Sequence, residues 1–303
     1  MDNRQMIDSL SVFFESIDER NWIKMRQTLA DTVILDSSPV GRPRRELSGD
    51  DLVALSRSVG GGFQNTCHHF GNFRQQQGGT HGEIDCDLMA LHYLPISSGA
   101  DTFVLFRKMK AGLSLREDGQ WLITYMQTIS EQQAGNPELL ALAQKNGQEH
   151  PPAVPGADLA VASTEEGPLG AEEVLPVTNE AVLDNFFTFL ENKDEPGFQS
   201  LWSEDGSWSM PFYARGGDQD LSGKSSVIEY FRRTSNGFPG SKFDRKYRHT
   251  DDPDIIIVPY DRKYLSAEGA EQTIVCAAIF SFKKGLIRGV EDYSYPDERS
   301  NKR

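Results

Sequence analysis

The chain is predicted to be an α+β protein built from two similar domains, because one order of elements occurs twice along its 303 residues. Each half begins with a helix whose apolar residues recur at helical spacing and include a Phe-Phe pair, Phe13-Phe14 or Phe186-Phe187. Each half continues with a short helix, a strand, a third helix and four long strands. Because 303 residues suit two domains of ordinary size, we expect an internal duplication at the level of fold.

In the first half, the apolar stripe of the opening helix extends from Met6 to Ile17, and Ser48 is a suitable N-cap for the third helix. A Gly-Gly turn at Gly78-Gly79 separates the first two of the four strands. The elements expected here are helices at 6–17, 21–30, 50–58 and from Asn136 to Leu142, a short strand at 32–36, and long strands at 65–75, 82–94, 101–115 and 120–130.

The composition changes between Lys145 and Thr178, where proline, glycine and small residues dominate, which predicts a mobile linker. The second half then repeats the pattern, with Ser222 as the expected N-cap of its third helix. We therefore divide the chain into residues 1–144, 145–178 and 179–303. The second-half elements are expected at 182–190, 198–202, 207–212, 222–233, 243–250, 254–265, 272–284 and 286–295.

Composition indicates a globular protein, with 38% hydrophobic and 25% charged residues. A formal net charge of −14 argues against nucleic acid or an anionic membrane surface as a partner. The three cysteines, Cys67, Cys86 and Cys276, are widely spaced within strand patterns. They fit buried free thiols and a cytoplasmic location better than a disulfide or zinc framework.

Two histidines stand out in the strands of the first half. Side chains on a strand alternate between its faces, so His68, Phe70 and Asn72 share one face of the 65–75 strand. His92 ends an almost wholly apolar row on the next strand. Its expected partner is His68 or a carboxylate from a helix over the sheet. His69 and His81 are assigned to surface or turn positions.

Both halves resemble the nuclear transport factor 2-like superfamily, and the first half resembles in particular scytalone dehydratase and SnoaL-like lyases. The resemblance is carried by S-I-D-E-R-N-W (16–22), T-C-H-H-F-G (66–71) and M-A-L-H-Y-L (89–94). It implies cone-shaped domains and a catalytic aspartate with two histidines, at Asp18, His68 and His92. Ile17 and Ser37 stand where that dehydratase has tyrosines. The substrate contacts expected beside these residues are Asp36, Phe70, Asn72, Tyr93 and Tyr125, with Asp36 also a substitute for Asp18 as the pocket carboxylate.

The second half looks more like the PhzA/PhzB-type phenazine biosynthesis proteins. The matching runs are L-W-S-E-D-G (201–206), D-D-P-D (251–254) and G-L-I-R-G-V-E-D-Y-S-Y-P (285–296). Asp292 falls where those proteins have a longer acid, and Tyr230 falls where they have a histidine. The resemblance therefore implies a structural domain or a modified pocket, which buries its sheet against the first domain or another subunit.

Three function classes follow from these residues. The first is a cofactor-independent lyase or isomerase acting on a hydrophobic small molecule, aromatic ones included. An imidazole oriented by a carboxylate supplies the base, and a second imidazole, Tyr93 or Tyr125 supplies the acid. The second is a metal enzyme using two histidines and one carboxylate. The third is a non-catalytic binding or assembly protein, with homo-oligomers formed through sheet faces.

The domain division predicts the result of limited proteolysis. The first cuts are expected within 145–178, because a Pro/Gly-punctuated linker presents exposed backbone to a protease, and two stable fragments should remain. Mass spectrometry of the fragments identifies the cut sites. Early cleavage within 65–130 while 145–178 resists would contradict this division.

Overall fold

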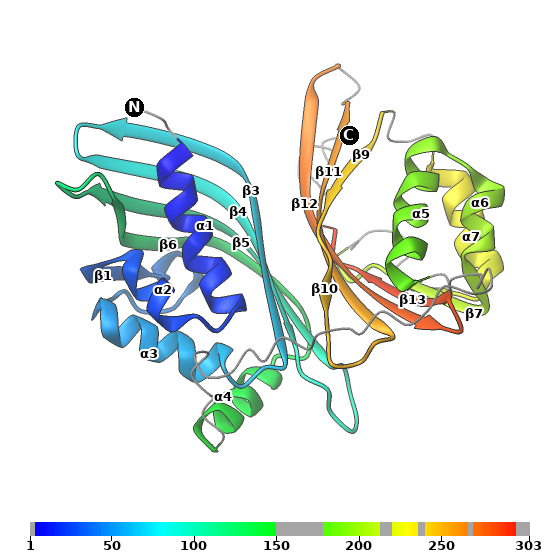
Figure 1. The fold of residues 1–303 in the computed structure, drawn as a ribbon, viewed down its shortest axis with the longest axis horizontal. Helices are drawn as coiled ribbons and strands as arrows, with labels where there is room; N and C mark the ends of the chain where they lie inside the picture. Colours follow the sequence, from blue (N-terminus) through cyan, green and yellow to red (C-terminus); the bar gives the residue numbers. More distant parts are fainter. Residues whose placement is uncertain (1–3, 150–177, 213–219, 236–239, 266–268, 295–303) are drawn as a thin grey trace, which may run out of the picture.

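The computed structural model describes residues 4–149, 178–212, 220–235, 240–265 and 269–294, and these form two α+β domains (Figure 1). Each domain is cone-like, with a curved, mainly antiparallel sheet covered on one face by helices, as the sequence predicts. Most of the predicted linker, over 150–177, lies outside the described residues. Of the described helices, none is both long and apolar enough to cross a membrane.

The first domain has a six-stranded sheet in the order β2-β1-β6-β5-β4-β3, in which only the β1–β6 pair is parallel. Its third helix begins where predicted, because the Ser48 side chain accepts a hydrogen bond from the Asp51 N–H. The elements are α1 (Arg4–Asp18), α2 (Trp22–Gln27), β1 (Leu29–Asp36), the 3₁₀ helix η1 (Ser38–Val40), β2 (Arg45–Ser48), α3 (Gly49–Gly60), β3 (Asn65–Gly78), β4 (His81–Tyr93), β5 (Thr102–Leu115), β6 (Trp121–Gly135) and α4 (Leu139–Glu149).

The second domain repeats this topology, with strands in the order β10-β11-β12-β13-β7-β8 and β13–β7 as the parallel pair. The counterpart of β3 is divided into two pieces, β9 and β10, which both pair with β11. The elements are α5 (Asn179–Asn192), α6 (Glu195–Ser200), β7 (Trp202–Ser209), β8 (Asp220–Ser222), α7 (Lys224–Thr234), β9 (Lys242–Arg245), β10 (Arg248–His249), β11 (Ile255–Leu265), β12 (Glu271–Lys283) and β13 (Leu286–Asp292).

Two local predictions for the second domain are wrong. Ser222 ends strand β8 instead of capping α7, whose N-cap is Gly223 with no side-chain capping bond. The strand expected over 243–250 is interrupted between Arg245 and Arg248. Lys246 still donates its backbone N–H to the Pro259 carbonyl, so the chain stays beside β11 through the interruption.

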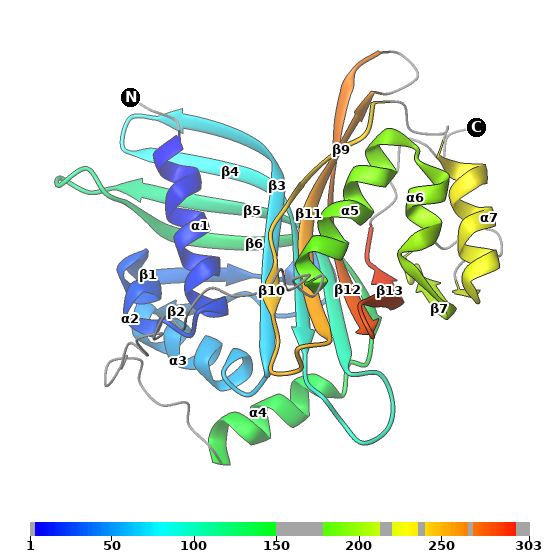
Figure 2. The same ribbon diagram turned by 45° about the vertical axis from the view of Figure 1, so that its right-hand side comes forward.

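The two sheets pack against each other, with the helices of both domains on the outer sides (Figures 1 and 2). Strands β3 and β4 contact β12, and β3 also contacts β11. The second sheet thus covers the first within one chain, one of the two arrangements expected from the sequence. First-domain side chains in this apolar layer are Cys67, Met89, Leu91, Tyr93, Val104 and Phe106.

Polar contacts also cross between the domains. The His69 ring Nε2 lies 3.0 Å from Asp261 Oδ1, so the surface or turn role expected for His69 is wrong. Gln64 donates to Asp251 at 2.6 Å, and Thr102 Oγ1 lies 2.9 Å from the Tyr293 hydroxyl. All three cysteines are buried free thiols, as predicted.

The apolar layer between the sheets predicts the effect of shortening one of its side chains. Leu91 is fully buried there. Leu91→Ala should lower the free energy of unfolding by about 2–5 kcal/mol, because it removes buried methyl groups and leaves a cavity. Chemical denaturation followed by tryptophan fluorescence measures the loss. Leu142→Ala, at a side chain that is 41% exposed, is the control and should change stability little; equal effects would contradict the prediction.

Candidate active site

The first domain contains a cavity of about 670 Å³ between its sheet and its helices. This volume lies within the range of about 300–1,000 Å³ that small-molecule sites usually have. The walls are mainly apolar, and His68, His92 and Thr66 lie together on the sheet side. Other lining residues that matter for the chemistry are Arg42, Arg107, Glu131, Thr128 and Gln133.

His68 and Asp18 form a hydrogen-bonded pair. Asp18 is the last residue of α1, and its fully buried carboxylate lies with Oδ1 2.7 Å from His68 Nδ1. Its Oδ2 accepts the His68 backbone N–H at 2.8 Å, and Oδ1 also accepts the Thr66 hydroxyl at 2.9 Å. A carboxylate that receives these donors is ionised and can only accept, so His68 Nδ1 is the donor in this hydrogen bond.

Several cations and donors keep the Asp18 carboxylate ionised despite its burial. Burial alone would raise the pKa of Asp18, but His68 and then Arg248 outweigh it and lower the pKa. Arg20 holds the Thr66 hydroxyl in place, since its Nη1 donates to Thr66 Oγ1 at 2.8 Å. Arg20 itself stands in a left-handed turn directly after α1, with φ of 57°.

His92 is a neutral neighbour of the pair. Its Nδ1 lies 3.1 Å from the Phe103 carbonyl oxygen, which can only accept, so Nδ1 is the donor. Burial first, and His68 second, lower the pKa of His92 to about 3. The His68 and His92 rings meet edge to face with centroids 6.0 Å apart. His92 therefore presents an unprotonated Nε2 near neutral pH, and the acid role considered for a second imidazole does not fit it.

The partner expected for His92 also requires correction. The sequence suggested His68 or a helix carboxylate, whereas the partner is the Phe103 carbonyl directly opposite on β5. His68 and His92 are diagonal neighbours on β3 and β4, because Thr66 is the residue opposite His92. The helix carboxylate, Asp18, belongs to His68 instead.

The five residues expected to contact a substrate do not line this cavity. Tyr93 faces the second domain, because it follows His92 on β4 and adjacent strand residues point to opposite faces. Asn72 sits in a β-bulge with φ of 56° and donates to Asp87, so the strict alternation that placed it beside His68 fails there. Phe70 packs against Phe14 within the first-domain core.

The other two of these residues contact each other away from the cavity. Asp36 accepts hydrogen bonds from Ser38, from the Tyr125 hydroxyl at 3.2 Å and from Gln127 at 3.0 Å. The Ser38 donors are the main reason that the pKa of Asp36 falls to about 2. Asp36 therefore does not substitute for Asp18, and Tyr125 does not reach the His68 pair as an acid.

Two charged residues on the cavity wall, Arg107 and Glu131, were not found from the sequence. Arg107 and Arg42 both donate to Glu131 Oε2 at 2.6 Å. Burial alone would raise the pKa of Glu131, but the two guanidinium groups outweigh it and lower the pKa. Glu131 is thus held as a paired carboxylate and is a poor base. Strand alternation could have found Arg107 and Glu131. Each lies two positions from another residue of this wall, Leu105 on β5 and Gln133 on β6.

The donor geometry does not favour the metal alternative. Within residues 4–149 and the described segments of the second domain, no group of three or more His, Cys, Asp or Glu side chains is arranged to hold a metal ion. The physical reason is visible at the first-domain pair: Asp18 is engaged by His68 Nδ1, so the two cannot direct open ligand positions at one ion.

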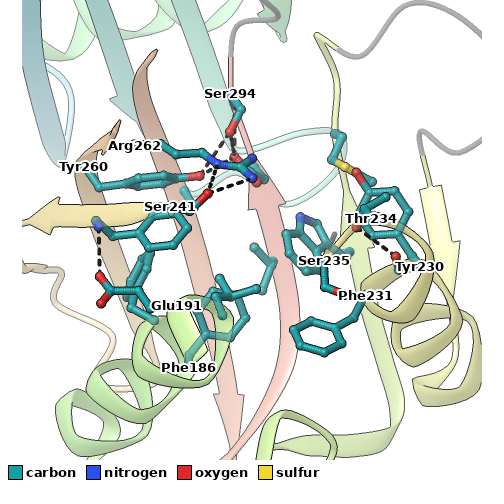
Figure 3. A pocket seen from close by; sticks show the side chains of 18 of the residues that line it. Phe186, Glu191, Tyr230, Phe231, Thr234, Ser235, Ser241, Tyr260, Arg262 and Ser294 are labelled. Carbon is teal, nitrogen blue, oxygen red and sulfur yellow. Dashed lines mark hydrogen bonds between the residues drawn. The ribbon is translucent and has the colours of Figure 1, made fainter. Parts of the chain in front are cut away.

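The second domain has a smaller pocket, of about 90 Å³, which contains both residues expected there, Tyr230 and Asp292. Tyr260, Arg262, Ser241 and Ser294 gather at one end of it, and Tyr230, a residue of α7, lies on the opposite side (Figure 3). Burial raises the pKa of Asp292, which accepts from the Tyr260 hydroxyl at 2.9 Å. This end therefore offers a carboxyl group whose charged form is disfavoured by burial, together with a phenol.

Comparison with family models finds a match in the second domain. Residues 183–290 match the family model described as a SnoaL-like domain. No curated protein matches the chain.

Similar solved structures each cover less than half of the chain. The Kfla4162 protein of Kribbella flavida is 19% identical over 46% of this chain and 97% of its own, with a TM-score of 0.43. A protein of unknown function from Cytophaga hutchinsonii, described as NTF2-like, is 18% identical over 38% and 97%, with a TM-score of 0.31. A Catenulispora acidiphila protein with a ketosteroid isomerase-like fold is 12% identical over 38% and 85%, with a TM-score of 0.33.

The low pKa of His92 predicts a pH-dependent stability. Between its folded value of about 3 and its ordinary value of 6.5, the unfolded chain binds a proton that the folded protein does not. The free energy of unfolding should therefore fall on acidification, by about 2 kcal/mol from this residue between pH 7 and pH 5. His92→Gln should remove that part of the loss in urea titrations at the two pH values. His81→Gln, at an exposed histidine, is the control. Identical losses in His92→Gln and the unmodified protein would refute the assignment.

Proposed function

We propose that the first domain is a cofactor-independent acid/base enzyme, a lyase of the elimination or dehydration type or an isomerase, that acts on a hydrophobic small molecule. The observation that carries the proposal is the Asp18–His68 pair, with a 2.7 Å hydrogen bond, on the wall of a mainly apolar cavity of about 670 Å³. An imidazole oriented in this way by a buried carboxylate is a general base with a fixed tautomer.

In the proposed reaction, His68 Nε2 removes a proton from the substrate and the Asp18 carboxylate stabilises the imidazolium that forms. His92 stays neutral and offers Nε2 as an acceptor for a substrate hydroxyl or N–H. Thr128, Gln133 and Arg107 supply polar contacts on the same cavity wall.

The proposed acid is the His68 imidazolium itself, since His92 is neutral, Tyr93 and Tyr125 lie outside the cavity and Glu131 is held as a carboxylate. In an elimination, the C–H bond breaks, a C=C bond forms, and the leaving hydroxyl takes the proton from His68 and departs as water. In an isomerisation, the same proton returns to a different carbon. Both reactions need a single group that accepts a proton and then returns it, which is the role proposed for His68.

Hydrogen exchange tests the proposal without knowledge of the natural substrate. The purified protein is incubated in D₂O with apolar cyclic β-hydroxy ketones and β,γ-unsaturated ketones, and NMR follows deuterium incorporation and product formation. His68→Gln should reduce the rate by about 10²–10⁴-fold, because it removes the general base. His81→Gln is the matched control and should retain the rate.

Two outcomes would contradict the proposal. One is equal rates in His68→Gln and the unmodified protein, which would place the chemistry elsewhere. The other is tight binding of such ketones, seen by calorimetry, with no exchange and no turnover in the unmodified protein. That result would favour the alternative of a non-catalytic binding protein.

A further inference from the structure

A cation from the second domain approaches the buried Asp18 carboxylate of the first. Arg248 lies on β10, and its Nη2 is 3.8 Å from Asp18 Oδ2, the oxygen that also accepts the His68 backbone N–H. The Asp18 side chain is completely buried, whereas the Arg248 side chain is 32% exposed. The guanidinium thus reaches from the rim of the domain interface toward the interior of the first domain.

The structure around Arg248 holds the guanidinium near the pair. The short strand β10 is fixed by pairing with β11, where Arg248 is opposite Ile257. The neighbouring residue, His249, accepts a hydrogen bond from the Asn65 side chain through its carbonyl, which ties this strand to the start of β3. Arg248 Nε is buried without a hydrogen-bond partner among the described residues, so the group is not anchored by a competing carboxylate at that atom.

The charges around the Asp18–His68 pair determine how Arg248 affects the protonation of His68. With His68 neutral, one carboxylate faces two guanidinium groups, Arg20 through Thr66 and Arg248 directly. Protonation of His68 adds a second excess positive charge in a largely buried region, which is unfavourable. Among the described residues, the other titratable or charged groups near the pair include Cys67, a buried thiol whose pKa is raised to about 12 and which is therefore neutral, and the neutral His92. They also include the Arg107–Glu131 pair on the same cavity wall and Lys246, whose charge acts on Cys67.

We propose that Arg248 is a positioning residue supplied by the second domain, which partly neutralises Asp18 and so keeps His68 unprotonated and ready to act as a base. This role rests on the proposed function, because it concerns the same pair, and it gives the second domain a part in the chemistry of the first. Without the cation, Asp18 would hold His68 more firmly as an imidazolium, and a smaller fraction of the protein would carry a free base.

NMR of the substrate-free full chain tests the proposal. The ring signals of His68 are followed against pH in the unmodified protein and in Arg248→Met, with His68→Gln used to assign the signals. The pH at which His68 is half-protonated should rise by about half to one unit in Arg248→Met, as expected for loss of one charge several ångströms away. Arg248→Lys retains the charge and should stay close to the unmodified protein.

Two further variants separate charge from structure. Gln64→Ala removes a hydrogen bond across the same interface but no charge, and should leave the His68 midpoint unchanged. Arg248→Gln is uncharged but polar, and repeats the test if Arg248→Met does not fold. An unchanged midpoint in the folded uncharged variant, or an equal shift in Gln64→Ala, would overturn the proposal. The measurement needs no substrate, so a shift of the His68 midpoint can be detected whether or not the exchange assay detects catalysis.

Discussion

The packing of the two sheets is the constraint on which the candidate site depends. Where the two sheets meet, strands β3, β4 and β5 have the second domain on one face and the first-domain cavity and helices on the other. Since side chains alternate along a strand, each interface residue has a cavity residue beside it. Cys67 precedes His68, Leu91 precedes His92, and Val104 precedes Leu105. The interface and the cavity are therefore two sides of the same strands.

This arrangement explains which parts of the site could be predicted from the sequence. His68 and Asp18 could be found because the alternation of β3 and the resemblance to known lyases point to the same positions. Tyr93 could not be placed, because a strand that is buried on both faces is apolar on both and does not reveal which face meets a cavity. Asn72 was misplaced because a bulge with a positive φ at a non-glycine residue leaves no clear pattern in the sequence.

Contacts between the two domains were harder to predict from the sequence than the residues of the site. Arg248 and Asp18 are separated by more than two hundred positions, and no local pattern connects them. The repeated order of elements did predict two domains, and one of the two expected arrangements, with sheet against sheet, brings β10 to the edge of β3. The division of the second-domain edge strand into β9 and β10 was not foreseen, although it places Arg248 on a separate two-residue strand beside the first domain.

The two pockets differ in a way that suits different tasks for the two domains. In the first, a buried carboxylate is ionised because His68, Thr66 and Arg248 all favour its charged form. In the second, burial dominates at Asp292 and favours the protonated form, although Ser294, Tyr260 and Arg262 oppose it. An ionised acid can orient an imidazole through a hydrogen bond, whereas burial disfavours the charged form of an acid that lies beside a phenol. The same fold therefore holds two buried carboxyl groups whose pKa values shift in opposite directions, because nearby cations and donors outweigh burial at Asp18 and burial outweighs them at Asp292.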